Sequence, residues 1–239
     1  MQIGAQQAIG SPMPKKTFFN LPDDKRERIT QLAINEFSAH PYRSASLSNI
    51  VAQAGIAKGS IYQYFQNKFD LYRWLVLEEI PRRKRAWMAN HPPPTGLGFY
   101  EQLEHRLLMG FRFGMSLPHA NRLAQALLEP TSDPQLLALH QSAQALTHQG
   151  MRALVEQARA DGALREDIDT DVAAAFIAAV MRSGLSQLAR LRTGHDLYTL
   201  LSKAHQGEVD FPESLQRQLV HEIVRMMQRG LAGREPPAR

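Results

Sequence analysis

The chain has 239 residues, of which 44% are hydrophobic and 21% charged, and its formal net charge is +5. This length and composition are ordinary for a globular protein with a real core, and they exclude a disordered or fibrous chain. No cysteine is present, which excludes disulfides and cysteine zinc sites and suits a reducing cytoplasm. No apolar run reaches the roughly 18 residues of a membrane span, and the first 20 residues lack the apolar block of a secretory signal.

The positive charge is concentrated in the first 90 residues. They contain 13 Lys and Arg against 7 Asp and Glu, whereas the remaining residues contain 15 against 16. Such an asymmetry is expected of a chain with one polyanion-binding end, since neutralising phosphates drives non-specific DNA affinity. An excess of this size also lies within ordinary surface variation, so the charge alone decides nothing.

The first residues show no helical period and are expected to form a mobile tail over residues 1–19. Met13 is an alternative start, which leaves open whether Met1 to Pro12 belong to the native chain. Lys15 and Lys16 are either DNA contacts or ordinary solvated residues of this tail.

A helix is predicted from Asp23 to about Ala39. Asp23 and Asp24 place negative charge in the first turn, where the helix dipole favours it, and Pro41 ends the pattern. One face of this helix is apolar and is expected to be buried through Ile29, Leu32, Ala33 and Phe37. We expect the helix to brace the segment that follows it.

Two short helical patterns come next and are separated by Gly55. Ser46 is a good N-cap for the first pattern, whose apolar face is made by Leu47, Ile50, Val51 and Ala54. Gly55 can adopt the left-handed conformation that often ends a helix, and Ile56 can then pack between the two helices. The spacing indicates a helix-turn-helix.

The second helix of this motif has an inward and an outward face. Ile61 and Phe65 lie four residues apart and can face the first helix. Hydrogen-bonding side chains are expected on the outward face, namely Lys58, Ser60, Tyr62, Gln63 and Tyr64. A helix presented in this way fits the major groove of DNA, and Gly59 would let the backbone approach closely.

Residues 23–71 resemble the N-terminal domain of the TetR/AcrR family of transcriptional regulators. The resemblance rests on residues at the family's spacing, namely Ile50, Ala54, Gly55, Ile56, Gly59, Tyr62, Tyr64, Phe65, Lys68 and Leu71. It implies DNA contacts at the start of the first motif helix, along the recognition helix, and at a phosphate-binding lysine after it. These contacts would fall on Ser46, Ser48, Lys58, Gly59, Ser60, Tyr62, Gln63, Tyr64 and Lys68.

Three positions depart from the family pattern. Ala57 stands where a serine commonly caps the recognition helix, Pro41 where a glycine commonly precedes an aromatic residue, and Phe69 where an acid is common. None of these removes a contact group, but Ala57 weakens the cap.

The resemblance implies an all-α protein with an N-terminal three-helix helix-turn-helix domain and a larger helical domain for effector binding and dimerisation. By this analogy the first domain covers residues 20–66, the second covers residues 67–230, and a C-terminal tail covers residues 231–239. The resemblance also implies a bacterial cytoplasmic protein that associates with the nucleoid.

In the family, the helix after Lys68 joins the two domains, and its tilt changes the spacing of the two DNA-reading heads. Here Pro81 is expected to kink this helix or to start a new segment. The basic run of residues 82–85 either adds contacts to the DNA backbone or forms a solvated last turn. Residues 90–98 are the clearest loop in the chain.

The rest of the chain is predicted to be helical, with Pro and Gly between the helices and no useful strand alternation. The predicted helices cover about residues 99–116, 119–129, 134–161, 169–193 and 213–230. Residues 162–169 are also similar to the family's connection between its seventh and eighth helices.

A homodimer is expected through residues 169–193 and 212–230. Apolar stripes there can form half of a four-helix bundle across a two-fold axis, through Val172, Phe176, Val180, Leu215, Leu219, Ile223 and Met226. Two recognition helices held about 34 Å apart would read a palindromic operator in double-stranded DNA.

A small-molecule effector is the other partner that the resemblance implies. An effector that prefers another head separation would release the DNA. Large, adaptable apolar side chains between the central helices are the candidates for its pocket, namely Met109, Phe113, Met151, Phe176 and Met181. Their character favours a hydrophobic effector, although Met and Phe at helical spacing are also typical of a plain core.

Two other classes of function are open. An enzyme is poorly supported, because the nine histidines form no His-Glu-x-x-His motif and no pair four residues apart, and because a nucleophile elbow and a phosphate loop are absent. No catalytic residue, metal site or cofactor is therefore expected. An architectural protein that bends DNA without an effector would bind DNA without a consensus sequence.

Overall fold

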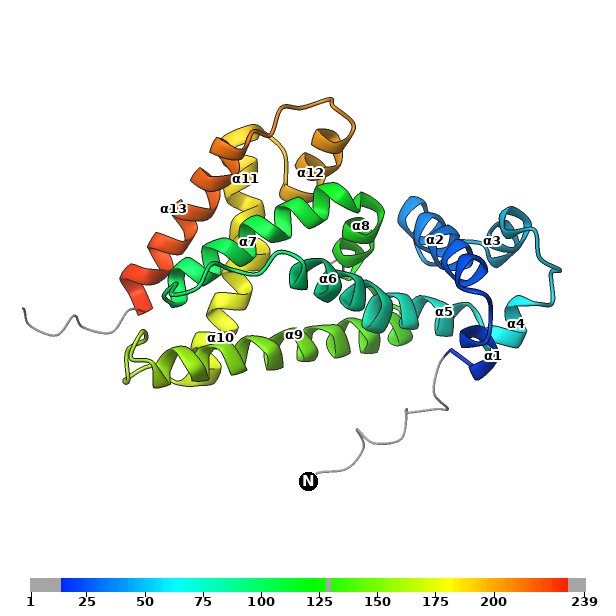
Figure 1. The fold of residues 1–239 in the computed structure, drawn as a ribbon, viewed down its shortest axis with the longest axis horizontal. Helices are drawn as coiled ribbons and strands as arrows, with labels where there is room; N and C mark the ends of the chain where they lie inside the picture. Colours follow the sequence, from blue (N-terminus) through cyan, green and yellow to red (C-terminus); the bar gives the residue numbers. More distant parts are fainter. Residues whose placement is uncertain (1–13, 128–129, 232–239) are drawn as a thin grey trace, which may run out of the picture. The chain divides into compact units, whose positions relative to one another are not determined.

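The computed structural model describes residues 14–127 and 130–231 of the chain (Figure 1). Within these ranges the regular secondary structure is helical and no strand is formed, which confirms the predicted all-α class. The larger parts of the two predicted tails lie outside the described residues. The chain divides into two units, Met1–Arg83 with Arg122–Ala126, and Lys84–Asn121 with Leu127–Arg239.

The first unit contains the helix-turn-helix. It is made of α1 (Lys16–Phe19), α2 (Asp23–Ala39), α3 (Leu47–Ala54), α4 (Ile61–Tyr64), α5 (Lys68–Trp74), the π-helical turn η1 (Leu75–Glu79), the start of α6 (Ile80–Ala89) and the end of α8 (Pro118–Ala126). The predicted first helix is present at its expected bounds as α2. Its predicted inward face is confirmed, because Ile29, Ala33 and Phe37 are buried and Leu32 is half-buried.

The expectation of a tail up to residue 19 is wrong for the residues that the structure describes. Lys16–Phe19 form the short helix α1, and the side chain of Phe18 is fully buried. Its ring centroid lies 5.0 Å from that of Phe65 and 5.2 Å from that of Trp74. A buried phenylalanine provides enough hydrophobic free energy to hold a short segment against the domain.

A continuous helical segment leads from α5 through η1 into α6. Pro81 has no N–H to donate to the carbonyl four residues earlier, so a regular α-helix is disturbed at this point. In the preceding π-helical turn, the N–H of Ile80 bonds to the carbonyl of Leu75, and the helix then continues past the proline. Pro81 is thus accommodated by a widened turn and does not start a separate segment.

The division between the two units falls after Arg83, inside α6, whereas the family analogy places it near residue 66. The helix α5 belongs with the first unit because its apolar side chains complete that core. Leu71 is fully buried, and the Trp74 ring lies 5.7 Å from Phe65.

The second unit is the larger one. It is made of α7 (Phe99–Ser116), the first part of α8 (Pro118–Ala126), α9 (Pro134–Ala160), α10 (Thr170–Ala179), the π-helical turn η2 (Val180–Gly184), α11 (Leu185–Thr193), α12 (Leu197–His205) and α13 (Glu213–Leu231). The predicted helices match α7, α8, α9, the run from α10 to α11, and α13 to within a few residues. Residues 128–129 of the second predicted helix lie outside the described ranges.

The helices α7 and α13 pack side by side and run in opposite directions (Figure 1). Glu104 Oε1 lies 2.9 Å from His221 Nδ1, and Arg112 lies 3.2 Å from Glu213. Leu219 and Ile223 of α13 are buried in the core of this unit. The predicted dimer stripe on α13 is therefore wrong at these two positions, because they face the protein's own core.

Candidate DNA-binding interface

The first motif helix begins at a well-defined cap. The Ser46 hydroxyl accepts the N–H of Asn49 at 3.4 Å, as its position in the sequence predicted. The buried carboxylate of Glu36, on α2, accepts the N–H of Ser46 at 2.7 Å. Gly55 ends α3 with φ of 68°, the left-handed conformation that was expected. The contribution of Glu36 was missed, because an acid in a helix does not reveal which loop it will meet.

The recognition helix α4 has only four residues, Ile61–Tyr64. It is preceded by a tight turn in which the N–H of Ser60 bonds to the carbonyl of Ala57 at 2.8 Å. No side chain caps α4, in agreement with the alanine at the usual capping position. Ile61 and Phe65 are buried as predicted, and they fix the inner face of the motif.

The seven predicted DNA-contact residues from Ser46 to Gln63 are exposed or half-buried, and we call them the exposed polar surface of this motif. Tyr62 is 51% exposed, and both the turn before it and the residue after it are open to solvent. Exposed positions are Ser48, Lys58, Gly59, Tyr62 and Gln63, and half-buried ones are Ser46 and Ser60. This surface offers hydroxyl, amide and ammonium groups, which suit phosphate oxygens and base edges.

Tyr64 does not lie on this surface, so its predicted outward position is wrong. Its side chain is 6% exposed, and its ring lies 5.8 Å from that of Phe18. It follows Ile61 by three residues, and residues three apart share a helix face. Tyr64 therefore belongs to the buried side of α4.

Lys68 is also placed differently from the prediction of a phosphate contact. Its ammonium donates to the carbonyls of Tyr42, Arg43 and Ala45 at 2.8, 3.1 and 3.0 Å. It also lies 4.7 Å from the centre of the Tyr42 ring. Because an ammonium has three N–H groups, all of its donors are occupied. Lys68 holds the loop that leads into α3, and in this arrangement no donor is left for a phosphate.

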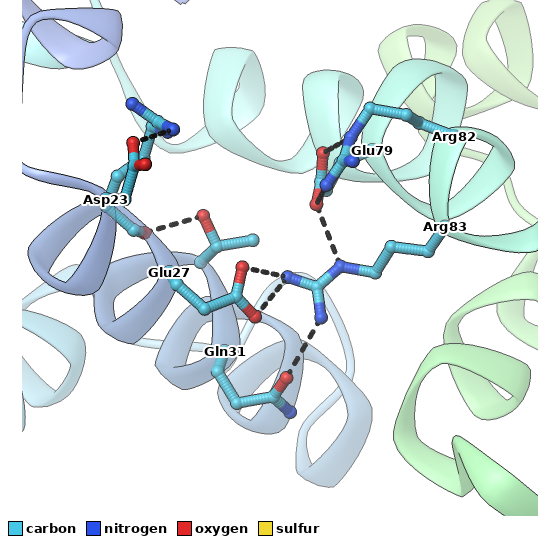
Figure 2. A network of polar contacts seen from close by, with 8 residues as sticks. Asp23, Glu27, Gln31, Glu79, Arg82 and Arg83 are labelled. Atoms are coloured by element: carbon cyan, nitrogen blue, oxygen red, sulfur yellow. Dashed lines mark hydrogen bonds and ion pairs between the residues drawn. The ribbon is translucent and has the colours of Figure 1, made fainter. Parts of the chain in front are cut away.

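The polar network in Figure 2 joins the beginning of α6 to α2 within the first unit. Arg83 donates to Glu79 at 2.8 Å, to Gln31 at 3.3 Å and to both carboxylate oxygens of Glu27 at 2.7 and 2.9 Å. Arg82 makes a bidentate pair with Glu79 at 2.7 and 2.8 Å. We call these five residues the α2–α6 network.

The basic run thus contains two different kinds of residue. The Arg83 side chain is 14% exposed and the Arg82 side chain 60% exposed, so the reading as a solvated last turn is wrong for Arg83. The spacing of Glu79 to Arg82 and Arg83, three and four residues apart on one helix, could have indicated these pairs.

Glu79 is the buried centre of the α2–α6 network. Burial by itself raises the pKa of the Glu79 carboxyl, but hydrogen bonds from Arg82 and Arg83 and their positive charges outweigh it and lower that pKa overall. The carboxylate is therefore held in its charged form. Arg83 is the last residue of the first unit, so the network fixes the part of α6 from which the second unit begins.

The predicted effector residues differ in how deeply they are buried. Met109 and Phe113 are buried on α7, Met151 is buried on α9, and Met181 in η2 is partly buried against the core. Phe176 points outward from α10 and is 47% exposed.

A hollow of about 600 Å³ lies instead between α9 and α10. Six of its nine lining residues are of polar type, and none of the five predicted positions is among them; the lining consists of Gln141, Gln144, Ala145, Thr147, His148, Gln149, Arg152, Ala175 and Ala178. Ala175 and Ala178 come from α10, and the other seven residues come from α9.

Within residues 14–127 and 130–231, no three His, Asp or Glu side chains are grouped so that they could hold a metal ion. None of the helices described combines the length and the apolar character that crossing a membrane requires.

Comparison with protein families matches residues 29–74 to the family described as "Bacterial regulatory proteins, tetR family". This range begins inside α2 and ends with α5, so it covers the whole helix-turn-helix. The match therefore applies to the same residues that form the exposed polar surface.

Similar proteins extend the likeness beyond this domain. A TetR-family transcriptional regulator from Chloroflexus aurantiacus is 29% identical, with a TM-score of 0.66 over 93% of this chain and 100% of that one. The "Probable acrEF/envCD operon repressor" of Escherichia coli K12 is 23% identical over 72% of this chain and 80% of its own length. The "HTH-type transcriptional repressor AcnR" of Corynebacterium efficiens is 22% identical over 70% and 84%.

These relatives are named as transcriptional regulators, and their similarity covers both units of the chain. The helix-turn-helix with its exposed polar surface provides the DNA-binding part that such a regulator needs. The chain is a DNA-binding transcriptional regulator whose helix-turn-helix, within residues 29–74, matches the TetR family.

Proposed function

We propose that this regulator is a homodimeric repressor that binds a palindromic operator and is released by a small molecule. The supporting observation is the exposed polar surface of α3, α4 and the turn between them, backed by a buried core. Repression is inferred from the relatives, two of which are named as repressors. We infer that it acts in the bacterial cytoplasm, at the nucleoid.

The DNA contacts are proposed to divide into two groups. Lys58 and Gln63 are long, exposed and able to reach base edges in the major groove. Ser46, Ser48, Ser60 and Tyr62 have hydroxyl groups that suit phosphate oxygens, and the backbone at Gly59 can approach closely. Tyr64 is omitted because it is buried, and Lys68 is assigned to holding the loop before α3.

Dimerisation is proposed through residues 169–193 and 212–230. Large apolar side chains on these helices are exposed, namely Val172, Phe176, Leu191 and Met226. Exposed apolar side chains that gather in one patch mark protein interfaces, and a two-fold partner would cover the same side chains on both chains. One recognition helix reads few base pairs, whereas two heads multiply specificity.

The effector is proposed to bind in the second unit and to shift the spacing of the two heads. A difference of a few kcal/mol in its affinity for the two states is sufficient. A hydrophobic effector stays a prediction, based on Met109, Phe113, Met151 and Met181; Phe176 is better assigned to the dimer surface.

The proposal is tested by selecting bound duplexes from a random DNA pool at fixed, near-physiological salt and sequencing them. We expect enrichment of an inverted repeat with half-sites about one helical turn apart. Lys58→Ala should relax the preference at one or two positions, whereas Lys203→Ala in α12 of the second unit should leave the motif unchanged.

A different outcome would support the architectural alternative. Salt-sensitive binding to all sequences without an enriched repeat would contradict the operator proposal, because non-specific binding is driven by counterion release. Extraction of the protein with organic solvent before a repeated selection would then show whether a bound effector had prevented recognition.

A further inference from the structure

The recognition helix α4 is too short to stabilise itself. An isolated helix needs about 12–15 residues to be even marginally stable in water, and α4 has four. Its backbone also leaves the helical conformation immediately, since Phe65 has φ of −130° and ψ of 147°. The last four carbonyls of a helix have no partner within it, so all four carbonyls of α4 need donors from residues outside the helix.

The segment that was expected to be a tail supplies most of these donors. The carbonyl of Ile61 is bonded by the N–H of Phe65 at 2.9 Å, which is local. The carbonyl of Tyr62 accepts from the Lys15 ammonium at 2.8 Å. The carbonyl of Gln63 accepts from the Thr17 hydroxyl, and the carbonyl of Tyr64 accepts from the N–H of Lys15 at 2.9 Å.

The same segment is anchored independently of these hydrogen bonds. Phe18 is fully buried against Phe65 and Trp74. The guanidinium of Arg26, on α2, donates to the carbonyls of Phe19 at 3.2 Å and Leu21 at 3.3 Å. Lys15 and Thr17 are therefore presented to α4 from a fixed base.

We propose that Lys15–Phe18 position the recognition helix for DNA reading, with Lys15 and Thr17 as the positioning residues. The carbonyls that they hold belong to Tyr62, Gln63 and Tyr64, and two of these residues carry proposed DNA contacts. A small rotation of α4 would move both contact side chains together. This inference rests on the proposed function, since it assumes that α4 reads DNA.

The proposal also assigns the positive charge of Lys15. Its ammonium is bonded to a backbone carbonyl of α4, so its main role is to fix the helix and not to neutralise a phosphate. The adjacent Lys16 is exposed and is not among the donors to α4. These two neighbouring lysines therefore form a matched pair for an experiment.

The experiment uses the full chain and four variants. Thr17→Val removes the hydroxyl donor at nearly constant shape, and Thr17→Ser keeps a hydroxyl. Lys15→Met removes the ammonium but keeps the main-chain N–H, and Lys16→Met removes the neighbouring charge. The operator obtained by selection is titrated at several salt concentrations, and amide hydrogen exchange of residues 62–65 is measured in the free protein.

We expect Thr17→Val and Lys15→Met each to weaken operator binding by about two- to tenfold per head, the usual effect of a lost hydrogen bond. The salt dependence should stay that of the parent chain, and amide exchange in residues 62–65 should become faster. Thr17→Ser should restore both affinity and protection. Lys16→Met should leave the exchange rates unchanged.

Two results would overturn the proposal. The first is parental affinity and exchange in Thr17→Val and Lys15→Met. The second is a shallower salt dependence in Lys15→Met without faster exchange, because loss of a phosphate contact lowers the slope by about 0.9 per phosphate. Failure of the proposed function itself would look different, since the parent chain would then select no operator while the exchange results would still report on α4.

Discussion

Gly59 is a glycine that the fold itself does not require. It is not among the glycines with positive φ, and a Cβ built on it would meet no described atom within 4 Å. Replacing such a glycine with alanine reduces the entropy of the unfolded chain and stabilises a protein by about 0.4–1 kcal/mol. A requirement for glycine here must therefore come from outside the chain, and close approach of DNA to the backbone is the proposed reason.

We accordingly predict that Gly59→Ala raises or preserves the free energy of unfolding in urea while it weakens operator binding. Gly55→Ala is the matched control, because φ of 68° at that position strains any residue with a Cβ. It should lower the free energy of unfolding. Parental operator affinity in Gly59→Ala would contradict the assigned close approach.

The role of Lys68 can be tested in a similar way, since its hydrogen bonds assign it to the loop before α3 and not to a phosphate. We predict that Lys68→Met and Lys68→Arg both weaken operator binding without changing its salt dependence. Arginine keeps the charge, but its planar guanidinium cannot replace an ammonium that donates to three converging carbonyls. Recovery of binding in Lys68→Arg, with a shallower salt slope in Lys68→Met, would restore the phosphate assignment.

These residues also show what sequence reasoning could and could not provide. The motif, its caps and the exposed positions of Lys58 and Tyr62 could be predicted from local spacing. The burial of Tyr64 could have been predicted from its spacing of three residues from the buried Ile61. The Phe18 ring that covers it could not, because Phe18 is far away in the sequence. The partners of Lys68 are backbone carbonyls, and no side-chain pattern reveals them.

Among the helices, the joint from α5 to α6 combines a π-helical turn, a proline and the α2–α6 network. We predict that Arg83→Met lowers the free energy of unfolding by about 1–3 kcal/mol, because it removes charged hydrogen bonds from the buried Glu79 and from α2. The more exposed Arg82→Met should lower it by about 0–1 kcal/mol. Denaturant titration measures both, and a larger loss in Arg82→Met would contradict the role given to Arg83.

The same network predicts a pH dependence of stability. The folded-state pKa of Glu79 lies below its ordinary value of 4.5, so its contribution to stability is present above that value and is lost as pH falls through the folded-state pKa. Between about pH 6 and pH 3, Glu79→Gln should lose less stability than the parent chain. Urea unfolding over this range measures the difference, and parallel curves would contradict it.

The helices themselves were predictable wherever an apolar period ran for several turns. The four residues of α1 are too few to show a period, and α12 was overlooked although Asp196, an N-cap, precedes an apolar pattern. The π-helical turns have no characteristic sequence pattern. Pro81 indicated only that the helix would be disturbed near this position.

For the molecule as a whole, the sequence predicted the class of fold and a regulator's two parts, but not an effector site. Helical spacing indicates which side chains face inward on one helix; it does not tell which helices share a cavity. Met109, Met151 and Met181 are thus buried or partly buried, and the hollow between α9 and α10 was not predicted at all.

The exposed apolar side chains of the second unit are proposed to determine whether the chain dimerises. We predict that Phe176→Asp, on α10, converts the proposed dimer to monomers, because burying an unpaired carboxylate in an interface is strongly unfavourable. Operator affinity should fall by about a hundredfold or more, since two half-sites are then no longer bound together. Sedimentation and operator titration measure the two effects.

Leu137→Asp on α9 is the matched control. Leu137 is 46% exposed against 47% for Phe176, so it experiences a similar change in charge and exposure, but it lies outside the proposed interface. It should leave both the dimer and the operator affinity intact. A dimeric Phe176→Asp together with a monomeric Leu137→Asp would move the interface to α9. Dissociation with Phe176→Asp but unchanged operator affinity would instead show that one head is sufficient, and the reading of a palindrome by paired heads would have to be abandoned.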